Sequence, residues 1–387
     1  MKRQFTILFL CAALFAKAQI NQAFYHGIVA NVSYDTVLYN LQKLQAFGIK
    51  QPGTAALTNT KNWLIGKYQQ YGYSNIVSDN FTYGANTLTN IVVTKTGDLY
   101  PNTFLIVDGH YDTKTGTGTN DNGSGVAIIL EIARLLANVN TQFSIKFINF
   151  SAEESGLIGS DDYVTNISTP QNLDIRLVFN IDEVGGVAGQ TNNTVSCESD
   201  QSAPTANNAV SALFTDTLAQ ATAVYSGLST IITNAYGSDY VPFQQAGEII
   251  TGFYETNEST YVHGSGDNLA HLDTSYVVEI AKASTGAALF LARAYDVYTA
   301  TRIEAQKHSL NVYPNPFRDQ ITIENTSDEI YTYIIYGIDG KKICSQQISP
   351  ATQSLSNMAD LSAGFYILNV MDERGGVLER MKLIKNK

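Results

Sequence analysis

The chain has 387 residues, of which 44% are hydrophobic and 15% are charged. This composition is typical of a folded globular protein, and roughly 150 residues per domain predicts two or three domains. Thirty-five acidic against 24 basic side chains give a formal net charge of −11. That charge disfavours nucleic-acid binding, which needs a basic surface. No apolar run after residue 20 approaches the roughly 20 residues that span a bilayer.

The first 18 residues have the pattern of a secretory signal peptide. Lys2 and Arg3 supply a positive start, residues 5–15 form an apolar stretch, and Ala16-Lys17-Ala18 is a small-residue cleavage site. A buried N-terminal helix is the alternative interpretation. We expect cleavage after Ala18.

The three cysteines are too few for a disulfide scaffold. Cys11 could indicate a lipoprotein, but Leu10 stands before it where a lipoprotein signal has a small residue. Cleavage after Ala18 removes Cys11 and leaves Cys197 and Cys344, which we place in different domains. We therefore expect no structural disulfide.

Residues 19–300 predict a single α/β domain. In chain order we expect a helix at 56–71, a strand at 104–108, a helix at 124–139, a strand at 143–150, a helical stretch around 159–163, strands at 177–182 and 248–254, and a closing helix at 275–298. Strands that alternate with helices predict a mostly parallel central sheet flanked by helices on both faces. Ligands of such sheets bind beyond the carboxyl ends of the strands.

Polar side chains gather at those strand ends. His110 follows the first predicted strand, Glu153 and Glu154 follow the second, Asp182 ends the third, and Asp121 precedes the helix at 124–139. Burying so many carboxylates together is very costly unless cations neutralise them. Residues 177–281 contain no Lys or Arg. We therefore expect a metal centre.

The ligand types indicate which metal. Imidazole and carboxylate without thiolate suit zinc, with manganese or cobalt as substitutes. One His and one terminal carboxylate per ion, with a shared bridging carboxylate, would hold two ions about 3.5 Å apart. Of the five histidines, His26 lies near the mature N-terminus and His308 lies in the linker. His263 and His271 remain as candidates for the second imidazole.

The motifs at these positions resemble the di-zinc aminopeptidases of metallopeptidase family M28. The matching segments, in the family's order, are Gly-His-Tyr-Asp-Thr (109–113), Asn-Asp-Asn-Gly-Ser-Gly (120–125), Ser-Ala-Glu-Glu-Ser-Gly (151–156), Asn-Ile-Asp (180–182), Gly-Ser-Asp-Tyr-Val-Pro-Phe (237–243) and His-Gly-Ser-Gly-Asp (263–267). The resemblance implies a phosphorylase/hydrolase-like zinc exopeptidase fold and two Zn²⁺ per chain. It implies peptides with a free N-terminus as substrates.

The resemblance also implies the metal ligands. One zinc would be held by His110, Asp121 and Asp182. The other would be held by Asp121, Glu154 and His263, with Asp121 bridging the two ions. His263 is preferred over His271 because it has the family's His-x-x-x-Asp pattern.

Other site residues carry over from the same family. Glu153, directly before the glutamate ligand, would be the general base, while Asp112 would orient His110 and Asp239 would orient His263. Tyr240 is a departure, since the family often has His after Ser-Asp. Tyr240 and Tyr261 are both candidates for an oxyanion hydrogen-bond donor.

Two other functions share this fold. Glutaminyl cyclases use a single zinc and usually carry Trp directly before the last ligand His, where this chain has Val262; its only Trp is Trp63, in an early helix. A non-catalytic binding scaffold would have lost ligands or the base, whereas all five ligands and Glu153 are present. The sequence therefore predicts a secreted zinc-dependent aminopeptidase.

The last 77 residues predict a small all-β sandwich. Expected strands at 320–324, 330–336, 342–348 and 365–370 are separated by turn residues. Tyr313-Pro314-Asn315-Pro316, residues 361–366 and the basic tail 382–385 resemble the C-terminal sorting domain of type IX (Por) secretion substrates. A substrate-binding β module is the alternative.

The predicted organisation is a signal peptide at 1–18, a catalytic domain at 19–300, a linker at 301–310 and a sorting domain at 311–387. The sorting resemblance implies the type IX secretion machinery as a partner, with export through the periplasm to the cell surface or the medium. No nucleic-acid partner and no transmembrane anchor are expected.

Overall fold

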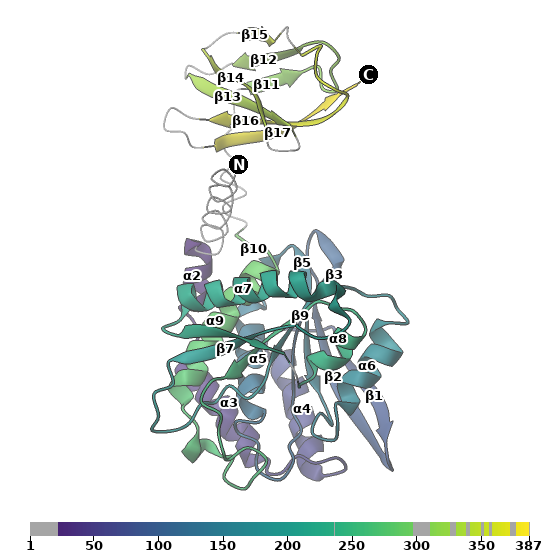
Figure 1. Cartoon of the computed structure of the whole chain (residues 1–387), viewed down its shortest axis with the longest axis vertical. Helices are drawn as coiled ribbons and strands as arrows, with labels where there is room; N and C mark the ends of the chain where they lie inside the picture. The colour runs from purple at the N-terminus through teal and green to yellow at the C-terminus, as the bar shows by residue number, and fades with distance from the viewer. Residues whose placement is uncertain are drawn as a thin grey trace. The chain divides into compact units, whose positions relative to one another are not determined.

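The computed structural model describes residues 22–235, 237–296, 310–325, 330–337, 341–349, 352–355, 358–371 and 377–386. The chain divides into two compact units, Met1–Tyr295 and Asp296–Lys387 (Figure 1). The predicted signal peptide, Cys11 and most of the predicted linker lie outside the described residues, so the predicted domain boundaries stay a prediction. Among the described helices, none has the length and apolar character that a membrane span requires.

The first unit is built on an eight-stranded sheet with the strand order β1-β2-β5-β3-β6-β9-β7-β8. Its strands are β1 (Ile76–Tyr83), β2 (Asn86–Lys95), β3 (Tyr100–His110), β5 (Phe143–Phe150), β6 (Asp174–Ile181), β7 (Thr194–Ser199), β8 (Ser229–Asn234) and β9 (Ile250–Glu255). The central strands β5, β3, β6 and β9 run parallel to one another. Antiparallel pairs occur on both sides of them, at β1/β2, β2/β5 and β7/β9. The α/β class is confirmed, and the sheet as a whole is mixed.

Helices flank this sheet (Figure 1). They are α2 (Ala23–Val29), α3 (Tyr34–Ala46), α4 (Ala55–Gln70), α5 (Gly123–Leu136), α6 (Ile158–Tyr163), α7 (Asn208–Tyr225), α8 (Tyr240–Gln245) and α9 (Thr274–Leu291), with short turns of helix at Val164–Ser168, Thr205–Asn207 and Leu269–His271. Alternate residues of the central strands enter different cores: Phe147 packs in the core that α5 and α9 share, and Ile148 in the core of α6 and α8. Both faces are therefore covered, as expected for parallel strands.

The closing helix is shorter than predicted. It ends at Leu291, and Arg293 follows with a left-handed φ of 50°. The next two residues form the short strand β10 (Ala294–Tyr295), which pairs with β4 (Asn140–Thr141). The sequence pattern also gave no sign of the β1–β2 hairpin or of the strands β7 and β8.

The second unit contains two antiparallel sheets. One has the order β11-β12-β15 and the other β14-β13-β16-β17. The strands are β11 (Leu310–Tyr313), β12 (Ile321–Asn325), β13 (Tyr331–Gly337), β14 (Lys342–Ile348), β15 (Thr352–Leu355), β16 (Gly364–Met371) and β17 (Val377–Lys385). Ile323 of one sheet and Tyr333 of the other belong to the same core, so the predicted all-β sandwich is confirmed.

Close backbone packing fixes the start of α5 against the end of β6. A Cβ atom on Gly125 would lie 2.2 Å from the Ile181 carbonyl oxygen, and one on Gly109 would lie 2.8 Å from the same oxygen. Asn122 caps the helix, because its side chain accepts a hydrogen bond from Gly125 N at 2.9 Å and donates one to Ile181 O at 2.8 Å. This packing brings Asp121 next to Asp182.

We predict that Gly125→Ala destabilises the first unit by about 1–3 kcal/mol, the usual cost of overpacking. The matched control is Gly66→Ala in α4, where an added Cβ meets nothing within 4 Å. Since glycine is a poor helix former, this control should gain up to about 1 kcal/mol. Denaturant unfolding of both variants measures the difference. A Gly125→Ala variant as stable as the parent would contradict the packing argument.

Candidate metal centre

The predicted ligands lie at one edge of the central sheet. His110 ends β3, Glu154 follows β5, Asp182 follows β6 and His263 lies in the loop after β9. Asp121 lies just before α5, between these strand ends. Because the carboxyl ends of parallel strands meet at the same edge, residues far apart in sequence come together there.

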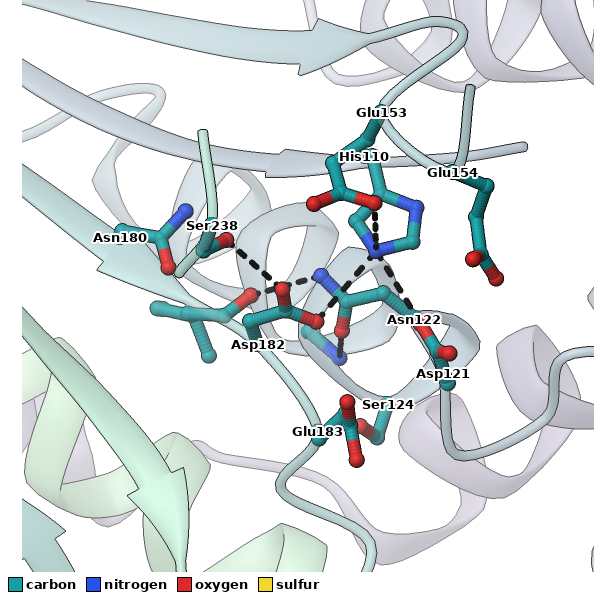
Figure 2. Close-up of polar contacts among 12 residues, drawn as sticks. His110, Asp121, Asn122, Ser124, Glu153, Glu154, Asn180, Asp182, Glu183 and Ser238 are labelled. Atoms are coloured by element: carbon teal, nitrogen blue, oxygen red, sulfur yellow. Dashed lines mark hydrogen bonds and ion pairs between the residues drawn. The ribbon is translucent and has the colours of Figure 1, made fainter. Parts of the chain in front are cut away.

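The first group of donors is buried. One ligand atom from each of His110, Asp121 and Asp182 lies within 4.8 Å of the others. Nε2 of His110 is 3.1 Å from Oδ1 of Asp121 and 3.4 Å from Oδ1 of Asp182 (Figure 2).

The second group shares Asp121 with the first. Asp121, Glu154 and His263 also offer ligand atoms within 4.8 Å of one another. Nε2 of His263 is 3.0 Å from Oδ2 of Asp121 and 3.1 Å from Oε2 of Glu154. The side chain of His263 is 46% exposed, so this group opens to solvent. The two oxygens of one carboxylate thus face two different imidazoles.

These residues fit zinc. Oδ2 of Asp121 and Oδ1 of Asp182 are buried, and in the described part of the chain each faces an imidazole nitrogen, at 3.0 Å and 3.4 Å, rather than a backbone N–H or a hydroxyl group. Such oxygens are costly to bury unless a cation meets them. Imidazole and carboxylate donors without thiolate are a zinc set, and three protein ligands in a group leave a position open for water or substrate. His271 belongs to neither group of described donors.

Asp112 lies beside His110. Its backbone oxygen is 3.3 Å and its carboxylate 3.6 Å from Nδ1 of His110. The same carboxylate accepts hydrogen bonds from the backbone N–H of Glu153 at 3.1 Å and of Glu154 at 3.3 Å. Asp112 therefore also fixes the loop that carries the predicted base.

Asp239 differs from the expectation that it orients His263. It is buried, and burial together with the charges of Glu153 and Asp108 raises its pKa well above the ordinary value, while His110 lowers it. In the described part of the chain, the ion pairs of His263 are with Asp121 and Glu154, and none joins it to Asp239. The motif therefore identified Asp239 as an acid of the centre, but it did not show that the histidine acting on Asp239 is His110.

The two tyrosine candidates are engaged elsewhere. Tyr240 is 1% exposed, and its hydroxyl donates a hydrogen bond to Oε1 of Glu198 at 3.0 Å. The ring of Tyr261 stacks on His271 with centroids 3.8 Å apart and planes 10° apart. The hydroxyl of Tyr240 is thus committed to Glu198, whereas the contact of Tyr261 involves only its ring, so the role of Tyr261 stays a prediction.

The sequence assigned no role to three supporting residues, although Ser238 and Asp267 lie in the matched motifs. Ser238 donates a hydrogen bond to Oδ2 of Asp182 at 2.7 Å, and Asp267 accepts one from the backbone N–H of Asp121 at 3.1 Å (Figure 2 shows Ser238). Lys50 is fully buried; burial lowers its pKa to about 8, although Asp267, Asp112 and Asp121 act to raise it. Lys50 lies more than 100 residues before the stretch 177–281, which contains no Lys or Arg. Because the sequence pattern around Lys50 carries no sign of the metal centre, its place there could not be predicted.

The acids and histidines of the centre shift one another's pKa values. Burial raises the pKa of Glu153 to about 7 and that of Glu154 to about 8, with nearby acids adding to the shift. Burial lowers the pKa of His110, but Asp182 and Glu153 raise it by more. Burial raises the pKa of Asp121, yet hydrogen bonds from His110 and His263 bring it below its ordinary value.

Known families match both units of the chain. The model described as Peptidase family M28 matches residues 90–288, just over half of the chain. The model described as Secretion system C-terminal sorting domain matches residues 311–386.

Individual relatives agree with the first of these matches. Aminopeptidase YwaD of Bacillus subtilis is 30% identical over 235 residues, which cover 58% of this chain and 46% of that protein. The chain thus spans less than half the length of this relative. Two crystal structures show the same fold: LapB of Legionella pneumophila (TM-score 0.62, 22% identity, 70% of this chain and 75% of that one) and a glutaminyl cyclase of Porphyromonas gingivalis (TM-score 0.56, 20% identity, 66% and 97%).

We predict that the metal-free protein loses stability as the pH rises from about 4.5 to about 8. In this range the folded state holds protons on Glu153 and Glu154 that the unfolded state has released, because their folded pKa values are raised, and stability falls as those protons leave. His110 and His263 act in the same direction. The lowered pKa of Asp121 acts the opposite way, but only near and below its ordinary value of 3.8.

Melting temperatures with chelator and with zinc, measured between about pH 5 and about pH 8, check this prediction. Zinc should stabilise the protein more at the higher pH. The double variant Glu153→Gln/Glu154→Gln should flatten the metal-free profile. A metal-free melting temperature that rises across the range would contradict it.

Proposed function

The chain belongs to peptidase family M28, and we propose that it is a secreted aminopeptidase that removes N-terminal residues from peptides with two zinc ions. The observation that carries the proposal is the shared carboxylate of Asp121, with one oxygen toward each group of donors. A centre for a single ion would need only one group of three donors, whereas this structure has two. The assignment of His110, Asp121, Glu154, Asp182 and His263 as ligands is part of the proposal.

When bound, the zinc ions would supply Lewis-acid polarisation of the scissile carbonyl and lower the pKa of a water molecule. Glu153 has the position of a general base. Its Oε2 lies 3.9 Å from Nε2 of His110, and its side chain is 17% exposed, so it borders the centre and can be reached by substrate. It would take a proton from the attacking water and give it to the leaving amine. In the metal-free protein, burial and nearby acids raise the pKa of Glu153 to about 7, and bound zinc would bring it lower, so that Glu153 is ionised and can accept a proton.

The charge of the centre favours a substrate with a free N-terminus. Its acidic lining attracts an ammonium group, whereas a carboxypeptidase needs a cation to hold the C-terminal carboxylate. Arg176 stacks on Phe143 and Phe214, 4.5 Å and 5.4 Å from the ring centroids, near the amino end of β6. Lys114 is nearer than Arg176, but it is the backbone N–H of this residue that binds Oε1 of Glu154. Lys50 is buried, and its ammonium group donates to the carbonyl oxygens of Gly48 and Thr117.

A glutaminyl cyclase is the second candidate, because one such enzyme shares the fold. Two observations favour the peptidase. The donors form two groups rather than one. Trp63 lies in α4 and packs against Phe47, so it does not replace the Trp that cyclases carry beside the last ligand.

The C-terminal unit contains a secretion system sorting domain, which indicates export to the cell surface or beyond. We propose that the type IX machinery recognises this unit and that the signal peptide at residues 1–18 directs the chain into the periplasm first. The catalytic domain would then act on extracellular peptides.

Glu153→Gln should lower turnover of leucine p-nitroanilide by about 10²- to 10⁴-fold while zinc content is unchanged, because the amide keeps the shape but cannot accept the proton. Steady-state kinetics with parallel metal analysis measures both quantities. Glu154→Gln is the contrasting neighbour and should lose zinc together with activity. Turnover of the Glu153→Gln variant within tenfold of the parent would refute its assignment as the base.

A further inference from the structure

A cavity of about 440 Å³ lies at one edge of the central sheet, between the strands β1, β2 and β5 and the segment 163–173. The helix α6, at the start of this segment, packs against β1 and β2 (Figure 1). Its volume is in the range of about 300–1,000 Å³ that small-molecule sites occupy. The proposed function makes no use of this space. Its walls combine a cation with apolar side chains: Lys146, Val77, Val92, Phe104, Ile167 and Leu173.

The charged part of the cavity is separate from the metal centre. Lys146 lies in β5, level with Thr94 of β2 and Ile106 of β3. His110 of β3 is level with Phe150, four residues further along β5. Four residues of a strand span about 13 Å. Lys146 therefore lies toward the amino ends of the parallel strands, whereas the metal ligands lie at their carboxyl ends.

Lys146 departs from the apolar pattern of its strand. Ile148 and Phe150, on the same face of β5, are buried in the core of α6 and α8, and so is Ile106 beside Lys146. A lysine among such neighbours is rare unless an acid pairs with it. Positions that break the local pattern in this way are often functional.

The ammonium group of Lys146 has only neutral partners. Nζ donates a hydrogen bond to Oγ1 of Thr94 at 3.2 Å and lies 4.6 Å from the ring centroid of Phe104. Burial lowers the pKa of Lys146, and no acid of the described residues acts to raise it. Asp79 also lines the cavity, but it is paired with Asn90, four residues before Thr94 and about 13 Å away along β2. The cation is thus positioned in the cavity without a counter-charge.

These features fit an organic anion with one charge and an apolar body. One ammonium group balances one carboxylate, whereas a phosphate group carries nearly two charges. The apolar walls would cover a hydrocarbon chain or an apolar side chain. Amide side chains that can donate hydrogen bonds line the exposed rim: Asn75, Asn102 and Gln171. A hydrogen bond between two charged groups is roughly twice as strong as a neutral one, so Lys146 would dominate the recognition.

We propose that this cavity binds the carboxylate of a small apolar organic anion through Lys146, at a site separate from the metal centre. The C-terminus of a short peptide and a medium-chain fatty acid both offer this chemistry. A peptide would make the cavity a second peptide site of the protein, and a fatty acid would make it a lipid site.

The test is calorimetric titration of the zinc-loaded protein with two probes, octanoate and N-acetyl-leucyl-leucine. The acetyl group removes the free amine, so the second probe is no substrate for an aminopeptidase. Lys146→Met keeps the length of the side chain and removes its charge, and it should weaken binding by about 10- to 100-fold. Octanol and the C-terminal amide of the peptide lack the carboxylate and should bind the parent with the same loss.

Lys95→Met is the matched control. Lys95 follows Thr94 in β2, so its side chain points to the other face of the sheet, and Asp98 acts on its charge. This variant should bind both probes as the parent does. Val77→Trp is a second test that leaves Lys146 in place. Val77 lines the cavity and is 52% exposed, so a larger side chain there should fill the space and weaken binding at least tenfold.

Binding of the acetylated dipeptide that depends on Lys146 assigns the cavity to peptide C-termini, and such binding of octanoate alone assigns it to fatty acids. Either result supports the proposal. It is overturned if neither probe binds the parent, or if both Lys146→Met and Val77→Trp keep the parent's affinity within twofold, since the probes would then bind elsewhere.

Discussion

The first unit of the chain depends on one constraint, the cost of bringing buried carboxylates together. Asp121 and Asp182 are almost fully buried within reach of the same imidazole, and Glu153 and Glu154 border them. Without strong positive charge such a cluster repels itself and must hold protons, as the raised pKa values of both glutamates indicate. Divalent metal at this place would resolve the repulsion, and in the proposed function the same charges would attract the ammonium group of the substrate.

The sheet supplies the geometry that this constraint needs. Parallel strands deliver His110, Glu154 and Asp182 to one edge from separate parts of the chain, and close packing of α5 on β6 adds Asp121. The strand that ends in His110, the strand that precedes Asp182 and the helix that follows Asp121 are all packed into the cores of the sheet, which position these donors. Asp112 then links the groups, because one carboxylate touches His110 and the backbone of both glutamates.

Much of this could be predicted from the sequence. The centre could be located because His110 and several acids stand at or just after the ends of predicted strands. The carboxyl ends of parallel strands lie at one edge of the sheet, so these residues had to meet there. Contacts across the fold could not be predicted in this way. Asp239 lies by His110 and Glu153, Tyr240 is committed to Glu198, and Lys50 reaches the centre from a distant segment. These positions depend on how helices pack, which no local pattern in one sequence encodes.

The most direct test of the account is the zinc content of the purified protein and of two variants, measured by mass spectrometry after dialysis. A shared carboxylate predicts about two zinc ions per chain in the parent, about one in His263→Ala and almost none in Asp121→Asn. A parent with a single zinc, or an Asp121→Asn variant that keeps two, would contradict the central claim that one carboxylate joins two ions.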